Sequence, residues 1–389
     1  MRLLVVGHSY VTAFAQRKYV AMKRADPELE LRIVTPSVMD HTFMRYRHEK
    51  HPALLPRETV AIGRVAGGSH MTYALDPFRL SAALRRFGPD HIHIEEDPHS
   101  VIGYETVSLA RWLRPKARIS FFIWDNLRRV PRFPVSVAKR VLTKYCLERA
   151  DLVVCGNAEA ERLLRTVKGY GGRTAVIPQV GLDPEDYSLP PAPRIREQVP
   201  ASTGTLWVGF VGRLAPEKGL VLLLESLRQL QHLPWRLLVI GSGPLKHEIE
   251  TRWKAVFGGR LLFLAAVRHE EVPEYLKCLD VFVLPSYATA SWKEQFGLTL
   301  AQAMMAGAAC IGSSCGAIPE VVGDGGVIVR EQDQDELSGA LRAVLCSESA
   351  RRALQGRARQ AAGERFSNTG VARRYLDVFR AVDPALAVG

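Results

Sequence analysis

Residues 209–219 have the sequence Gly-Phe-Val-Gly-Arg-Leu-Ala-Pro-Glu-Lys-Gly, and this stretch decides the fold. Its apolar start predicts the end of a buried strand, and Gly212 predicts a turn. Pro216 and Glu217 are typical of the first turn of a helix. A buried strand followed at once by a turn and a helix is the repeating unit of parallel α/β sheets.

The same unit repeats through the second half of the chain, where short apolar runs alternate with stretches of helical periodicity. The pattern predicts a doubly wound parallel sheet followed by a helical tail. We predict strands at 205–211, 236–241, 260–264, 280–284, 308–312 and 327–329, and helices at 217–231, 244–256, 270–278, 297–306, 333–346, 348–365 and 367–382.

The first half of the chain has the same alternation and predicts a second sheet of the same class. We predict strands at 2–6, 30–35, 58–63, 91–95, 118–123, 151–155 and 174–177, and helices at 10–25, 76–87, 101–113, 135–149 and 157–168. The fold class is therefore α/β, with two doubly wound, Rossmann-like domains in tandem that face a cleft.

A proline-rich, polar stretch separates the two patterns and predicts a linker. We expect a first Rossmann-like domain over 1–183, a linker over 184–203 and a second domain over 204–366. The last segment, 367–389, is expected to carry a helix that returns to the first domain. Since ligands bind beyond the carboxyl ends of the strands in such sheets, each domain should offer loops to a shared site.

Composition limits the class and location of the protein. The 389 residues are 47% hydrophobic and 24% charged, as in ordinary globular proteins. The apolar run at 2–6 is too short for a signal peptide, and no apolar run has the length of a membrane span, so we expect a cytoplasmic protein. Six cysteines without a C-x-x-C pair favour reduced, buried thiols.

The net charge of +12 favours an anionic partner. Residues 1–190 carry about +9 of it, from about 29 Lys and Arg against about 20 Asp and Glu. No nucleic-acid-binding motif accompanies this charge, so we expect no nucleic acid partner. Basic and apolar residues mix at 128–133 and continue with Lys139, Arg140 and Lys144, which favours peripheral contact with the inner face of a membrane. A solvated basic surface is the alternative.

Two segments of the second half carry residues suited to a diphosphate. Arg213 and Lys218 flank a turn between a strand and a helix, where cations and free helix amides favour an anion. Glu294 lies just before the helix predicted at 297–306, and Gln302 lies inside it, where its amide could bond a ribose hydroxyl. The amides that would receive phosphate are those of Phe296, Gly297, Leu298 and Thr299.

Two further turns belong to the same edge of the second sheet. Gly243 lies in a strand–turn–helix segment, where glycine lets the backbone approach a ligand, although the glycine pattern is incomplete as a dinucleotide fingerprint. Glu320 lies at the start of another helix, after strand 308–312. A helix cap or a plain surface charge is the alternative for each of these residues.

These segments, in this order and spacing, resemble the nucleotide-sugar-binding half of the GT4 family of glycosyltransferases, which have the GT-B fold. The resemblance covers 205–330 strongly and the first half weakly, through 89–98 and 177–183. It implies transfer of a sugar from a UDP- or GDP-linked donor to an acceptor, with retention of anomeric configuration, without an obligatory metal and without a further cofactor. The acceptor could be lipid-linked, a polysaccharide or a small molecule.

The resemblance also implies roles for named residues. Arg213 and Lys218 would hold the donor diphosphate, and Glu294 would lie near the transferred sugar. Gly212, Gly243, Phe296, Gly297, Leu298, Thr299, Gln302 and Glu320 would line the donor site. The family usually has a glutamate where this chain has Gln302, and many relatives have a histidine near 121–126, where this chain has none.

The first half offers candidates for contact with the acceptor or sugar at the ends of its predicted strands. They are His8, Glu95, Glu96, Asp125 and Asn126. His91 and His93 share a strand face near Glu95, but a buried strand makes a metal site awkward there, and we expect none. Two other functions stay open: another GT-B enzyme, such as an epimerase or a phosphorylase, and a catalytically weakened sugar-nucleotide-binding protein.

Overall fold

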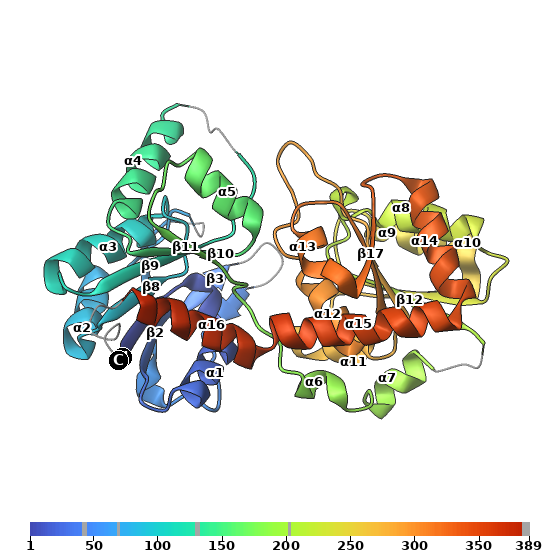
Figure 1. Cartoon of the computed structure of the whole chain (residues 1–389), viewed down its shortest axis with the longest axis horizontal. Helices are drawn as coiled ribbons and strands as arrows, with labels where there is room; N and C mark the ends of the chain where they lie inside the picture. Colours follow the sequence, from blue (N-terminus) through green and yellow to red (C-terminus); the bar gives the residue numbers. More distant parts are fainter. Residues whose placement is uncertain (41–44, 68–70, 129–132, 201–203, 383–389) are drawn as a thin grey trace. The chain divides into compact units, whose positions relative to one another are not determined.

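The computed structural model describes residues 1–40, 45–67, 71–128, 133–200 and 204–382 (Figure 1). The chain divides into two compact units, Met1–Gly181 with Asn368–Gly389, and Leu182–Ser367. Each unit contains one large parallel sheet with helices packed on it, which confirms the predicted fold class.

The first unit contains a seven-stranded sheet with the order β11-β10-β9-β8-β1-β2-β5, in which every neighbouring pair is parallel. Its central strands are buried on both faces, as parallel sheets require, and they are largely apolar, with His91, His93 and Ser120 as buried polar members. The strands are β1 (Arg2–Val6), β2 (Glu30–Pro36), β5 (Thr59–Ile62), β8 (His91–Ile94), β9 (Arg118–Ile123), β10 (Leu152–Cys155) and β11 (Arg173–Val176).

Helices cover both faces of this sheet (Figure 1). One face packs against α2 (Pro77–Phe87), α3 (Val101–Leu113), α4 (Val135–Leu147) and α5 (Ala158–Thr166). The other face packs against α1 (Arg17–Ala25) and α16 (Asn368–Ala381), so the C-terminal helix completes the core of the first unit. The rings of Tyr375 and Phe379 lie 5.6 and 5.0 Å from the ring of His93 on β8.

The second unit contains a six-stranded parallel sheet with the order β14-β13-β12-β15-β16-β17. Its strands are β12 (Leu206–Val211), β13 (Trp235–Ile240), β14 (Leu261–Leu264), β15 (Val281–Leu284), β16 (Ala309–Ser313) and β17 (Gly326–Val329). Its larger helices are α8 (Leu220–Gln229), α12 (Leu298–Ala306), α14 (Gln334–Cys346) and α15 (Glu348–Phe366), with the shorter α11 (Val272–Leu276) and α13 (Ile318–Val322).

Three predicted segments differ from the structure. The segment expected as a helix at 10–25 is a 3-10 turn at His8–Val11 followed by α1. The Gln16 side chain donates to the carbonyl oxygens of Tyr10 and Glu49, and these bonds hold a bend between the 3-10 turn and α1. The helix expected at 244–256 consists of α9 (Lys246–Glu248), a π-turn and α10 (Lys254–Phe257).

The stretch expected as a linker also contains structure. Its proline-rich sequence forms the short helices α6 (Glu185–Ser188) and α7 (Pro193–Gln198), which belong to the second unit. Glu274 on α11 accepts a hydrogen bond from the Ala192 amide at 2.7 Å, and this bond ties the stretch down. Two small hairpins, β3 (Val38–Asp40) with β4 (Arg45–Arg47) and β6 (Arg64–Ala66) with β7 (Ala74–Leu75), were not predicted. Across the described ranges, no helix has the length and apolarity needed to span a membrane.

We predict that Phe379→Ala destabilises the first unit by about 3–5 kcal/mol, because it removes a fully buried ring from the contact between α16 and β8. The urea midpoint of this unit, followed by hydrogen exchange of peptides from β1 and β8, should fall. The matched control is Arg373→Ala on the exposed side of α16, which should change stability by less than about 0.5 kcal/mol. Equal protection from hydrogen exchange in F379A and R373A would contradict the proposed packing role of Phe379.

Candidate active-site residues in the two units

In the second unit, the turns after β12 and β13 lie against each other at the carboxyl edge of the sheet. The amide of Leu214 donates to the carbonyl oxygen of Ser242 at 2.9 Å, and the amide of Leu245 donates to that of Leu214 at 3.0 Å. A Cβ at Gly243 would lie 2.5 Å from the Leu214 oxygen, so this close approach requires glycine. A Cβ at Gly212 would meet no described atom within 4 Å, so this turn has an open side.

The two predicted cations lie on this turn with acidic partners. Arg213 is partly exposed and pairs with Glu217. Lys218 ends a 3-10 turn, Pro216–Lys218, and its Nζ lies 2.6 Å from Oε2 of Glu294 and 4.6 Å from the ring centroid of Trp292. The structure therefore brings together two of the three residues predicted to be catalytic, Lys218 and Glu294.

The loop that carries Glu294 is held in place from several sides. Its carboxylate accepts from the Ser286 hydroxyl at 3.4 Å, and its carbonyl oxygen accepts from the Ala317 amide at 3.0 Å. Gly316 has a φ of +56°, and a Cβ there would lie 2.1 Å from the Glu294 oxygen. These contacts leave Glu294 nearly buried, with its carboxylate directed at Lys218.

Helix α12 begins beside Glu294 and can hold an anion at its first turn. Gly297 caps the helix with a φ of +82°, and the amides of Leu300 and Ala301 donate to its carbonyl oxygen. The amides of Leu298 and Thr299 come before this first bonded turn, so the helix itself gives them no acceptor. Phe296 has a packing role, because its ring meets the ring of Phe366 edge-on at 5.5 Å.

Gln302 is fully buried in α12, and neither its Nε2 nor its Oε1 has a hydrogen-bond partner among the described residues. A buried amide without partners costs free energy, and such groups call for an explanation, such as a missing ligand or water. The predicted contact with a ribose is one such explanation and stays a prediction. Glu320 is exposed on α13, and its carbonyl oxygen accepts from Arg365.

In the first unit, His8 and Glu96 meet at the ends of the adjacent strands β1 and β8. Oε1 of Glu96 lies 2.8 Å from Nδ1 of His8 and accepts from the His8 amide at 2.7 Å and from the Tyr73 hydroxyl at 2.7 Å. The imidazole remains 29% exposed, whereas Glu96 is buried. Burial alone would lower the pKa of His8, but the charge and hydrogen bond of Glu96 raise it above its ordinary value.

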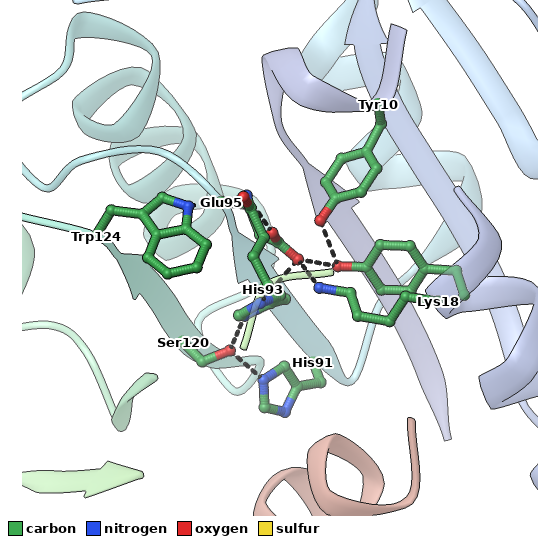
Figure 2. Close-up of polar contacts among 9 residues, drawn as sticks. Tyr10, Lys18, His91, His93, Glu95, Ser120 and Trp124 are labelled. Atoms are coloured by element: carbon green, nitrogen blue, oxygen red, sulfur yellow. Dashed lines mark hydrogen bonds and ion pairs between the residues drawn. The ribbon is translucent and has the colours of Figure 1, made fainter. Parts of the chain in front are cut away.

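Glu95, the neighbour of Glu96, points into the interior and anchors a buried polar network (Figure 2). Its Oε1 lies 2.6 Å from Nζ of Lys18 and also accepts from the Tyr19 hydroxyl, while its Oε2 accepts from Gln179 at 2.8 Å. Burial would raise the pKa of Glu95, but the charge of Lys18 holds it well below its usual range. Glu95 thus has internal partners on both oxygens, and its predicted contact with an acceptor stays untested.

His91 and His93 extend this network away from the strand ends (Figure 2). The Ser120 hydroxyl lies 2.7 Å from Nε2 of His91 and 2.7 Å from Nδ1 of His93. Burial lowers the pKa of His91 to about 3, so this imidazole stays neutral. No cluster of three metal-ligating side chains occurs in the ranges that the structure describes.

Asp125 and Asn126 follow β9, as predicted, in a loop beside this network. Asp125 lies 3.6 Å from Nζ of Lys168, and Asn126 is buried. The preceding Trp124 donates from Nε1 to Gln179 at 2.8 Å, and Gln179 in turn donates to Glu95. This loop is therefore connected to the buried network through the side chain of Gln179.

Several residues of these clusters were not found from the sequence: Lys18, Tyr19, Tyr73, Ser286 and Trp292. Lys18 stands beside Arg17 in a helix that also carries Lys23 and Arg24, and such a pattern looks like a solvated basic face. The available signal was Tyr19 next to Lys18, since a hydroxyl beside a lysine can share one buried acid. The partners themselves lie more than 75 positions apart and leave no local pattern.

We predict that Lys18→Met destabilises the first unit by about 3–5 kcal/mol, because it leaves Glu95 charged and buried without its cation. The double variant K18M/E95Q should recover much of this loss, since it removes both charges. Chemical denaturation measures both effects, with the exposed Lys116→Met as the matched control. If the double variant is no more stable than K18M, the ion pair does not account for the loss.

The pKa of His8 supplies a second prediction. Since Glu96 raises this pKa, the His8–Glu96 pair stabilises the fold fully below about pH 6.5, and this contribution is lost as the pH rises through the folded pKa of His8. Glu96→Gln should lower the pKa of His8, as measured by NMR titration of the imidazole. His91 should remain neutral in the same spectra, and an unchanged His8 in E96Q would show that Glu96 is not the cause.

The chain resembles known proteins in sequence and in fold. Residues 192–361 match the family described as Glycosyl transferases group 1. The D-inositol 3-phosphate glycosyltransferase of Stackebrandtia nassauensis is 27% identical over 208 residues, which cover 50% of this chain and 46% of that protein. The chain thus spans about half the length of the curated relatives it matches.

Solved structures match over nearly the whole chain. Sucrose-phosphate synthase from Thermosynechococcus elongatus has a TM-score of 0.69 at 20% identity, covering 98% of this chain and 99% of that one. HepE from Anabaena, in complex with UDP and glucose, has a TM-score of 0.67 at 18% identity, covering 98% of this chain and 100% of that one. These likenesses show that the chain has a GT-B fold, and the match over 192–361 shows that its second unit is similar to the glycosyl transferases group 1.

Proposed function

We propose that this protein is a retaining glycosyltransferase that moves a sugar from a nucleotide-diphosphate sugar to an acceptor hydroxyl. The observation that carries the proposal is the Lys218–Glu294 pair beside the first turn of α12. It places a cation, a carboxylate and helix amides at the carboxyl edge of one sheet, where α/β proteins bind ligands.

The chemistry of sugar transfer explains why such a group is useful. When the bond to the sugar breaks, negative charge grows on the diphosphate and positive charge grows on the sugar ring. In the proposal, Lys218, Arg213 and the amides of Leu298 and Thr299 stabilise the diphosphate. Glu294 holds Lys218 in place and faces the sugar. Gln302 bonds the ribose with its buried amide, whose two polar atoms have no partner within the described chain.

Different observations support the choice of nucleotide and the placement of the acceptor. The solved structure of HepE with UDP and glucose supports UDP as the nucleotide of the donor, and GDP is the alternative. We assign the acceptor to the first unit, at His8, Glu96, Asp125 and Asn126, because His8 combines a partly exposed imidazole with a buried carboxylate partner.

Retention and independence of metal belong to the proposal. In such a reaction the departing phosphate can accept the proton of the acceptor, so no second carboxylate is required. The chain has one Asp-x-Asp triplet, at 333–335, but Asp333 caps α14 by accepting from the Glu336 amide at 2.9 Å and pairs with Arg330 at 2.7 Å. The two cations and the helix amides are the groups that we propose to neutralise the diphosphate. The unpaired cysteines, most of them buried, suit the proposed cytoplasmic location.

A second candidate function is a sugar-nucleotide-binding protein with weakened catalysis. The observation that favours it is Gln302, a neutral side chain where the family usually has a carboxylate. This candidate shares the donor site with the proposed enzyme, and only turnover separates the two. Another GT-B enzyme, such as an epimerase or a phosphorylase, would be recognised by its products.

We predict that one of UDP, GDP or their common sugar conjugates raises the melting midpoint by about 5–10 °C at a hundredfold excess over Kd. Arg213→Ala with Lys218→Ala should abolish the shift. The matched control replaces two exposed cations of the same unit, Lys254 and Arg342, by alanine and should keep it. Stabilisation by NAD alone, or by none of these ligands, would contradict the donor site. If one of these nucleotides binds, NMR of the reaction products decides whether a glycoside with retained configuration forms.

A further inference from the structure

One helix of the first unit exposes apolar side chains to solvent. The side chains of Val137 and Val141 on α4 are 51% and 60% exposed, and Phe133, just before the helix, is 82% exposed. Val135 is similarly exposed at the first position of the helix. Single exposed apolar residues are ordinary on protein surfaces, but four of them within nine positions form a group that requires a partner.

The packing of α4 shows why these side chains are exposed. The helix is held to the unit mainly at its C-terminal end, where Cys146 and Leu147 are buried. Tyr145 lies against the Tyr104 ring at 4.9 Å and its hydroxyl is 3.1 Å from the Ser108 hydroxyl, both on α3. The first two turns of α4 contribute no buried residue, so they stand out from the core.

The charges on α4 are of one sign. Between Phe133 and Leu147 the sequence contains three cations and no acidic residue. Arg140 and Lys144 lie on the same side of the helix as Val137 and Val141, because these positions are three, four and seven apart. Lys144 has one acidic neighbour, Glu148, at 3.7 Å. We call Phe133, Val137, Arg140, Val141 and Lys144 the α4 surface, since Val135 and Lys139 lie on the other side of the helix.

We propose that the α4 surface docks the first unit on an anionic lipid bilayer, with its cations at the headgroup phosphates and its valine and phenylalanine side chains below them. A helix that mixes exposed apolar residues with cations matches the chemistry of such an interface. A second copy of this chain would bring like charges together, and an uncharged apolar partner would leave the cations unpaired. The basic excess of the first half of the chain, about +9 over residues 1–190, has the sign that an anionic bilayer attracts.

The docking itself does not rest on the proposed function, and it can be tested on the full chain without any assay of activity.

The test is sedimentation of the purified protein with vesicles of phosphatidylcholine, with and without phosphatidylglycerol. We expect binding only when phosphatidylglycerol is present, and weaker binding at higher salt. Arg140→Glu with Lys144→Glu should reduce the partition coefficient by about tenfold or more. Val137→Ser with Val141→Ser should also weaken binding, although it keeps every charge, because it removes the apolar contact.

The matched control is Lys254→Glu with Arg342→Glu, which makes the same change in net charge on exposed residues of the second unit and should bind like the wild type. Each variant is first checked for an unchanged melting midpoint. Failure to sediment with anionic vesicles, equal loss in the control, or binding that V137S/V141S leaves intact would overturn the proposal. A dimer in solution that V137S/V141S dissociates would overturn it as well, since the occupant would then be a second copy.

Discussion

Both candidate clusters depend on one constraint, that the strands of a parallel sheet all end at the same edge. His8 follows β1 and Glu96 follows β8, and these strands are neighbours although the two residues are 88 positions apart. Lys218 and Glu294 are 76 positions apart, and they follow β12 and β15, which also pair. The sheet cores provide the free energy that brings these loops together, so the loops themselves can carry polar groups with little apolar packing of their own.

Each unit has a lysine–glutamate pair at 2.6 Å, but the two pairs differ in access. Lys18 and Glu95 are both buried, and Tyr19 and Gln179 occupy the remaining hydrogen-bonding positions of the carboxylate, so no ligand can replace either partner without unfolding the network. Lys218 and Glu294 keep some exposure and lie beside a turn with an open side at Gly212. The closed pair holds the loop that contains Glu96, whereas the open pair leaves part of Lys218 accessible to a ligand.

Much of the architecture could be predicted from local patterns, because a buried parallel strand is a short apolar run and a turn residue follows it. The run at 118–123 and the helix at 101–113 match the structure at both ends. Bends set by distant partners could not be predicted: the helix expected at 10–25 begins only at Arg17, since Gln16 bonds to the carbonyl oxygen of Glu49. The residues predicted to bind the donor lie in recognisable turns, whereas Lys18 and Tyr73 act through partners that no local spacing reveals.

Gln302 stands where the family usually has a glutamate, and this difference fits a nucleotide site when the free energy of the protein without a ligand is considered. The side chain is fully buried, and neither of its polar atoms has a partner in the described chain. A glutamate in that position would be an unpaired charge closed to water, and such a charge costs more free energy than a neutral amide. Glutamine still provides a donor and an acceptor, so two hydroxyl groups of a ribose can satisfy it. In the proposed donor site, it also places no negative charge near the diphosphate. Glutamine in place of glutamate therefore lowers the free energy cost of the site without a ligand, and it keeps the hydrogen bonds that a sugar ring needs.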